Sequence, residues 1–118
     1  MKNKIKTICF DIDGVVCKTN KNFYKKSKPI FQNIKIINKI YLKGYRVILF
    51  TARFMGRSNE NVFKAKKRGF DFTKKQLSEW GVKYDKLIFG KPSFDLIIDD
   101  KALDFHSGWS KKILKKIK

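Results

Sequence analysis

Apolar residues occur along this chain in two arrangements, short runs and positions spaced three or four residues apart. Short apolar runs bounded by polar residues or glycine are typical of buried β-strands. We therefore predict strands at residues 4–10, 45–50, 86–89 and 95–98. Residues 14–28 are polar and rich in lysine, and we expect them to form a loop.

Helical spacing predicts a first helix that begins at Pro29, a residue suited to the first helical position, and ends at Gly44. Its expected apolar stripe consists of Ile30, Ile34, Ile37 and Tyr41. Residues 58–68 are predicted to form a second helix, with Ser58 as its N-cap and Gly69 as its stop.

Two shorter helices complete the prediction. Thr73 followed by Gln76 is a capping-box pattern, which predicts a separate short helix that ends at Gly81. Residues 110–118 have the spacing of a final amphipathic helix that covers the sheet.

This alternation of strands and helices predicts an α/β fold, a single domain over residues 1–118 with an open, mostly parallel sheet flanked by helices. In such sheets ligands bind beyond the carboxyl ends of the strands. Polar residues follow three of the predicted strands: Asp11, Thr51, and the pair Asp99 and Asp100. We expect these side chains to converge on one crevice.

Length and composition agree with one compact domain, since 118 residues, 42% of them hydrophobic, suffice for one core. No apolar run approaches the roughly 20 residues that span a bilayer, and Asp11 and Asp13 interrupt the stretch that a secretory signal would need. The two cysteines, Cys9 and Cys17, form neither a disulfide framework nor a metal–thiolate pattern. We expect a cytoplasmic protein with reduced thiols and no membrane contact.

The formal net charge of +19 has two interpretations. Dense Lys and Arg favour a polyanionic partner such as a nucleic acid. The charges are scattered along the whole chain, however, so we favour a solvated lysine surface. The ten acidic residues are more informative, because five of them fall in two short clusters: Asp11, Asp13, Asp99, Asp100 and Asp104.

Asp11 and Asp13 lie two residues apart at a strand end, so their side chains share a face, and Gly14 allows a sharp turn afterwards. Two carboxylates this close repel each other and need a cation or a shared proton. Together with Asp99 and Asp100 they offer hard oxygen ligands, which favour Mg²⁺ over zinc. A calcium-binding EF-hand does not fit, since its third oxygen ligand and its closing Glu are missing.

These residues also carry a family resemblance. The Asp-Ile-Asp-Gly sequence at Asp11 resembles the first motif of the haloacid dehalogenase superfamily, and Thr51 resembles its second. Lys91, between Gly and Pro, resembles the third motif, and Asp99-Asp100 resembles the fourth. The resemblance spans nearly the whole chain. It implies a Rossmann-like domain of this superfamily without a cap domain, because no segment is long enough for one.

The resemblance further implies a mechanism. Asp11 would attack phosphorus and form an aspartyl-phosphate, while Asp13 would act as general acid and then as general base. Thr51 and Lys91 would contact the phosphoryl oxygens as catalytic and substrate-binding residues. The ligands of Mg²⁺ would be Asp11, the backbone carbonyl of Asp13, and Asp99 or Asp100.

Four residues outside these motifs have open roles. Arg53 and Arg57 follow Thr51 at the predicted mouth of the crevice, where they either bind a second anionic group of the substrate or simply face solvent. Asp104 is a candidate for a further metal ligand. His106, the only histidine, has no apparent partner and is expected to pack or to lie on the surface.

We expect a Mg²⁺-dependent phosphomonoester hydrolase of a small phosphorylated metabolite, with a sugar phosphate of surface-polysaccharide synthesis favoured because residues 51–61 resemble phosphatases of that kind. The alternative is a phosphatase of nucleic-acid 3′ or 5′ ends, for which Phe23, Tyr24 and Phe54 would supply stacking surfaces. A non-catalytic binding module is a second alternative, although every residue needed for turnover is present. A homo-oligomer stays open, since cap-less members of the superfamily often borrow a neighbouring subunit as a lid.

Overall fold

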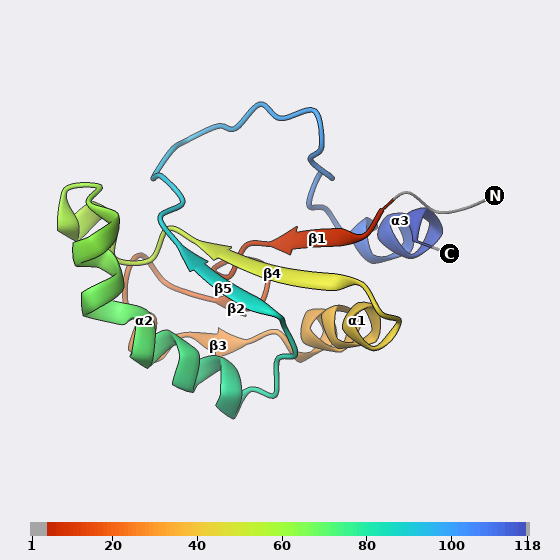
Figure 1. The fold of residues 1–118 in the computed structure, drawn as a ribbon, viewed down its shortest axis with the longest axis horizontal. Helices are drawn as coiled ribbons and strands as arrows, with labels where there is room; N and C mark the ends of the chain where they lie inside the picture. Colours follow the sequence, from red (N-terminus) through yellow and green to blue (C-terminus); the bar gives the residue numbers. More distant parts are fainter. Residues whose placement is uncertain (1–4, 118) are drawn as a thin grey trace.

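The computed structural model describes residues 5–117, and a parallel three-stranded sheet lies at its centre (Figure 1). The strand order is β1 (Thr7–Phe10), β4 (Arg46–Thr51) and β5 (Lys86–Phe89). Thr7 pairs with Arg46 and Thr51 pairs with Phe89, so the carboxyl ends of the three strands lie at the same edge. The predicted α/β class and three of the four predicted strands are confirmed.

Two helices form the crossover connections between these strands. α1 (Phe31–Leu42) connects β1 to β4, and α2 (Val62–Glu79) connects β4 to β5. In Figure 1 α1 and the C-terminal half of α2 lie below the sheet, the N-terminal half of α2 stands to its left, and α3 (Trp109–Lys116) lies beside the amino end of β1. The predicted helix at the end of the chain is therefore confirmed within the described residues.

The core lies between the sheet and its covering helices. The apolar side of α1 packs with β4 because its isoleucines recur at helical spacing while alternate residues of the strand face the same way. The fully or almost fully buried side chains of these two elements are Ile34, Ile37, Ile40, Val47 and Leu49. Ile40 takes the place that the sequence pattern assigned to Tyr41, which is only half-buried.

The predicted start of the first helix was wrong. Pro29 belongs to a short strand, β3 (Lys28–Pro29), which pairs antiparallel with β2 (Cys17–Lys18). A proline is tolerated there because its missing N–H removes only one ladder hydrogen bond. The predicted 14–28 loop thus holds a small two-stranded sheet and a 3₁₀ turn, η1 (Tyr24–Lys26).

The two helices predicted around Gly69 are one continuous helix, α2. Asn61 is its N-cap and accepts a hydrogen bond from the Lys64 backbone N–H at 3.0 Å, whereas Ser58 ends the 3₁₀ turn η2 (Gly56–Ser58). Gly69 does not end the helix. Its lack of a side chain instead leaves room for the ring of Phe54 to pack against the helix. A Cβ at this position would lie 2.1 Å from Cε2 of Phe54.

Replacing Gly69 by Ala is therefore expected to destabilise the protein, although Ala favours a helix over Gly by about 1 kcal/mol. The new methyl group would displace the Phe54 ring, and overpacking of this kind costs about 1–3 kcal/mol. Thermal unfolding measures the effect, with Ser78→Ala at an exposed position of the same helix as the control. If Gly69→Ala raised the melting temperature as the control should, the packing argument would fail.

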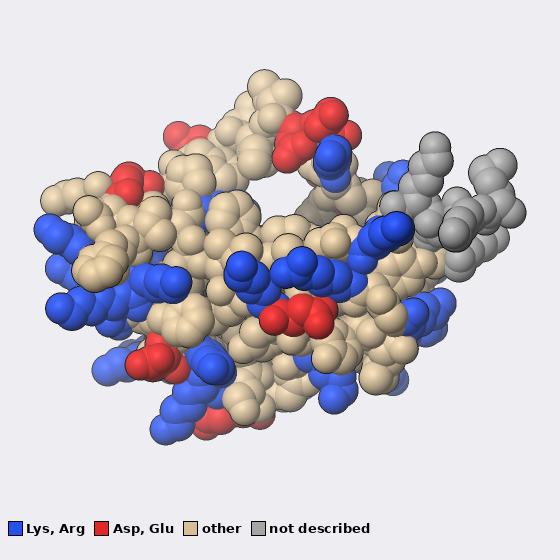
Figure 2. All heavy atoms as spheres, viewed as in Figure 1, with Lys and Arg blue, Asp and Glu red and all other residues tan. Residues whose placement is uncertain are grey.

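The strand predicted at residues 95–98 is also absent from the structure. Leu96, Ile97 and Ile98 are 81%, 55% and 94% exposed, and their segment has irregular backbone. A strand needs a partner for its backbone hydrogen bonds, and β1 pairs only with β4 among residues 5–117. Residues 90–108 instead arch above the sheet (Figure 1), and Figure 2 shows that the arch stands clear of the body.

No helix within residues 5–117 combines the length and the apolar character that crossing a membrane requires.

Candidate functional site

The site begins at the tight turn that follows β1. The carbonyl oxygen of Ile12 accepts backbone hydrogen bonds from Val15 and Val16 at 3.1 and 2.8 Å, and Gly14 takes a positive φ of 93°. Ile12 is fully buried, so the turn is anchored in the core. The carboxylates on either side, Asp11 and Asp13, are held at the carboxyl end of the sheet, as the sequence predicted.

Asp11 is half-buried and forms an ion pair with Lys91, whose Nζ lies 3.4 Å from Oδ2 of Asp11. Burial raises the pKa of Asp11 above its ordinary value, and this effect exceeds the opposing effects of Lys91 and of the Ile12 backbone N–H. A carboxylate that is desolvated and only partly neutralised keeps its reactivity as a nucleophile or as a ligand.

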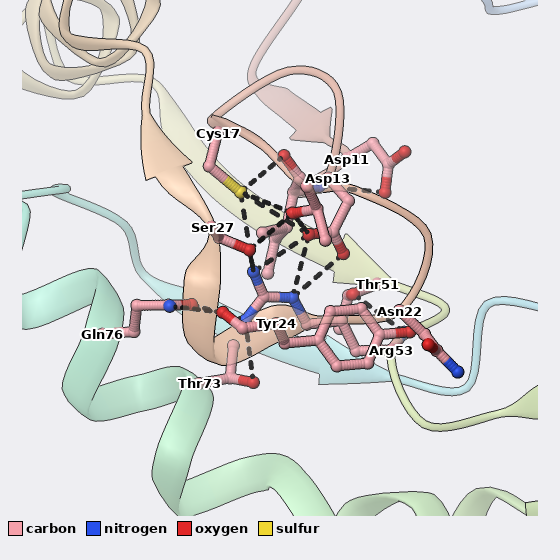
Figure 3. Close-up of polar contacts among 12 residues, drawn as sticks. Asp11, Asp13, Cys17, Asn22, Tyr24, Ser27, Thr51, Arg53, Thr73 and Gln76 are labelled. Atoms are coloured by element: carbon pink, nitrogen blue, oxygen red, sulfur yellow. Dashed lines mark hydrogen bonds and ion pairs between the residues drawn. The ribbon is translucent and has the colours of Figure 1, made fainter. Parts of the chain in front are cut away.

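Asp13 is held by the guanidinium of Arg53 in a two-point contact (Figure 3). Nε of Arg53 lies 2.9 Å from Oδ2 of Asp13, and Nη2 lies 2.9 Å from Oδ1. Thr19 Oγ1 donates a further hydrogen bond to Oδ1. Forked contacts of this kind fix the orientation of a carboxyl group as well as its position.

Arg53 is only 1% exposed, which differs from its predicted place at the mouth of the crevice. Its Nη1 donates to Oε1 of Gln76 at 2.6 Å and contacts Oγ1 of Thr73 at 3.4 Å. Thr73 and Gln76 are buried within the C-terminal half of α2 and do not form the predicted capping box. Two polar residues at helical spacing on a buried face were a signal for a buried charged partner, and sequence reasoning missed it.

Thr51 and Lys91 are joined by a backbone hydrogen bond, from Lys91 N–H to the Thr51 carbonyl oxygen at 3.2 Å. Oγ1 of Thr51 accepts a hydrogen bond from the Arg53 backbone N–H at 3.1 Å, and the side chain is fully buried. Thr51 thus holds the loop that carries Arg53. A direct contact between Thr51 and a phosphoryl group stays a prediction.

A cavity of about 410 Å³ opens over these groups. Asp11, Asp13, Arg53 and Lys91 contribute to its lining, together with aromatic and basic residues of the neighbouring loops. Arg57 lines its wall as predicted, with its guanidinium carbon 4.7 Å from the Phe54 ring centroid. The cavity can therefore admit an anionic group toward Asp11 between Lys91 and Arg57.

The carboxylates predicted to bind Mg²⁺ do not converge in this structure. Asp99 and Asp100 lie in the exposed arch, where Asp99 accepts a hydrogen bond from the Lys101 backbone N–H at 2.9 Å. Within residues 5–117 no group of three or more His, Cys, Asp or Glu side chains is placed to hold a metal ion. In this arrangement the four predicted ligands do not fit a Mg²⁺ site.

Asp104 is exposed in the same arch. His106 is half-buried, and its Nδ1 accepts a hydrogen bond from the Gly108 backbone N–H at 2.9 Å. The histidine therefore has a local structural partner, as a packing role implies.

No protein-family model and no curated protein sequence matches this chain. The crystal structure of a structural-genomics target from Vibrio cholerae has a TM-score of 0.78 at 24% identity, over 97% of this chain and 100% of that one. A chain of the Pnkp1/Rnl/Hen1 complex has a TM-score of 0.52 at 18% identity, over 97% of this chain and 35% of that one, so this chain spans about a third of it. At these identities the likeness establishes a shared small α/β fold.

Proposed function

We propose that this protein is a cap-less phosphomonoester hydrolase of the haloacid dehalogenase type, with Asp11 as its nucleophile. The observation that carries the proposal is the pair of carboxylates at the end of β1. One of them, Asp11, faces an open cavity beside Lys91, and the other, Asp13, is held rigidly by Arg53.

In the proposed reaction a carboxylate oxygen of Asp11 forms a bond to phosphorus as the ester P–O bond breaks. The leaving oxygen keeps the electron pair of that bond and takes a proton from Asp13, which enters this step in its protonated form and is left as the carboxylate that pairs with Arg53. Asp13 then accepts a proton from the water that attacks phosphorus, and the acyl-phosphate bond breaks to regenerate the Asp11 carboxylate and release phosphate. Lys91 stabilises the negative charge on the transferred group, because its ammonium already lies beside Asp11.

Mg²⁺ remains part of the proposal as the cofactor, with Asp99 or Asp100 among its ligands. Its binding would require residues 95–100 to move toward Asp11. Within residues 5–117, β1 pairs on one side only, with β4, so its other side gives the exposed apolar residues of the arch a place to pair and to become buried.

Phosphate release from p-nitrophenyl phosphate and from a panel of sugar phosphates and nucleotides tests the proposal. We expect turnover that is at least about a hundredfold faster with Mg²⁺ than with EDTA, since a divalent cation supplies several kcal/mol of charge stabilisation. Asp99→Asn and Asp100→Asn should show which residue supports the metal, with Asp95→Asn as the matched control from the same segment. Equal rates with Mg²⁺ and with EDTA would remove the metal from the proposal.

The first expected substrate class, a small sugar phosphate, stays a prediction that the same panel tests. Cytoplasmic localisation also stays a prediction, and a homo-oligomer stays open. The second candidate, a phosphatase of nucleic-acid ends, is favoured by a specific feature of the surface beside the site.

A further inference from the structure

A second cavity, of about 440 Å³, lies next to the one that contains Asp11. Its cations are Lys25, Lys26, Arg57 and Arg68, and no acidic residue of the described chain lines it. Arg68 belongs to the N-terminal half of α2, over which Lys and Arg side chains gather in Figure 2. The cavity therefore favours a ligand with several negative charges.

Arg57 forms the wall between the two cavities, because it lines both together with Asn22, Tyr24 and Phe54. Its Nη2 donates to the Asn22 carbonyl oxygen at 2.8 Å, and its guanidinium carbon lies 5.4 Å from the Tyr24 ring centroid. Arg68 in turn donates to the Arg57 carbonyl oxygen at 2.9 Å. Arg57 and Arg68 are thus linked in one wall, which extends from the cavity of Asp11 into the second cavity.

A small sugar phosphate does not account for this arrangement. The first cavity alone has the volume for a small ligand, so a sugar phosphate bound at Asp11 would leave the second cavity unused. The second cavity also presents aromatic surface, with Phe23 55% exposed and Phe72 half-buried in its lining. A single-stranded nucleic acid combines repeated phosphates with flat bases that stack on such rings.

We propose that the second cavity binds the nucleotides adjacent to a terminal phosphate of a single-stranded nucleic acid, whose terminal phosphate lies at Asp11. The inference rests on the proposed phosphatase function, and it specifies phosphorylated ends of single-stranded nucleic acids as the substrate class. Lys25 and Lys26 contact the backbone phosphates, and Phe23 and Phe72 offer stacking surfaces to the bases. The bound strand crosses Arg57 on its way from one cavity to the other.

The test compares the double variant Lys25→Gln/Lys26→Gln with Lys35→Gln/Lys39→Gln. The control variant makes the same charge change at exposed positions of α1 outside both cavities. Fluorescence anisotropy gives the affinity for a labelled, terminally phosphorylated oligothymidylate as a function of salt. We expect the first variant to bind about tenfold more weakly, with a salt slope reduced by about 1.4, since each contact with a single-strand phosphate contributes about 0.7. The control should bind like the unmodified protein.

Equal effects of the two double variants would overturn the proposal, because attraction would then come from the general charge of the protein. If an abasic strand of the same length bound with equal affinity, the bases would contribute nothing to binding. The ligand of the second cavity would then be any polyanion and not specifically a nucleic acid. Phosphate release adds a second readout. Turnover of the oligonucleotide should fall in Lys25→Gln/Lys26→Gln while that of p-nitrophenyl phosphate stays unchanged. Specific binding without turnover of any ester would refute the proposed function and leave the binding site intact.

Discussion

Asn in place of Asp11 is expected to lower phosphate release by at least about a thousandfold, because loss of a nucleophile removes the covalent route altogether. The amide has nearly the same shape as the carboxyl group, and it can keep a hydrogen bond with the Ile12 backbone N–H, which donates to Oδ1 of Asp11 at 2.9 Å. The variant should therefore fold normally. Asp71→Asn, at an exposed position of α2, is the matched control and should retain full activity.

Stability gives a second readout for the Asp11 variant. Since burial raises the pKa of Asp11 in the folded protein, the carboxyl group releases its proton more readily in the unfolded chain. Its ionisation therefore lowers stability as the pH rises above the ordinary value of a carboxyl group. At neutral pH the Asn variant should unfold at the same temperature as the unmodified protein or at a higher one.

The raised pKa also predicts how the metal-free protein titrates. With EDTA present, the Asp11 carboxyl group should take up its proton at a higher pH than an unperturbed aspartate, which the difference in melting temperature between the unmodified protein and Asp11→Asn measures as a function of pH. Substantial activity in Asp11→Asn would assign the chemistry to another group, whereas a melting temperature well below that of the control would contradict the argument from burial of the carboxylate.

The parts of this molecule that local sequence determines were predicted well. A short apolar run followed by Asp11 predicts a buried strand with a carboxylate at its end, and the strand ending at Thr51 follows the same logic. Sheet topology then brings Asp11 and Lys91 together, because parallel strands end at the same edge. Lys91 itself was picked out among the many lysines by its resemblance to the third superfamily motif, and not by the pattern of strands.

The predictions that failed depend on partners remote in sequence. A glycine at position 69 is typical of a residue that ends a helix. Here the helix continues, and the ring of Phe54 occupies the space where a side chain at this position would lie. Thr73 and Gln76 match a capping box, but both lie within α2, where they accept hydrogen bonds from the buried guanidinium of Arg53. The segment at 95–98 has the apolar pattern of a strand, and pattern alone does not supply an adjacent strand.

Arg53 is the residue whose role changed most between sequence and structure, and its replacement by Lys carries the second large prediction. Lys keeps the charge but loses the fork that orients the carboxyl group of Asp13. If Arg53 positions Asp13 as the general acid, hydrolysis of an alkyl phosphate should fall by about a hundredfold, as expected for loss of acid catalysis. p-Nitrophenyl phosphate has a leaving group that departs without a proton, so its hydrolysis should fall much less.

This difference between substrates separates positioning from a merely structural effect, which would lower both rates equally. Asp13→Asn should show the same selective loss, since it removes the acid itself. Lys also loses the hydrogen bonds that Arg53 donates to buried Thr73 and Gln76, so unfolding has to be monitored in the Lys variant. Gln76→Met provides a milder test, because it removes the 2.6 Å hydrogen bond to Nη1 of Arg53 and leaves the ion pair with Asp13 in place. A uniform loss of activity on both substrates in a folded Arg53→Lys protein would show that Arg53 supports the fold and not the acid, and the orientation of Asp13 would then depend on Thr19 and the turn after β1.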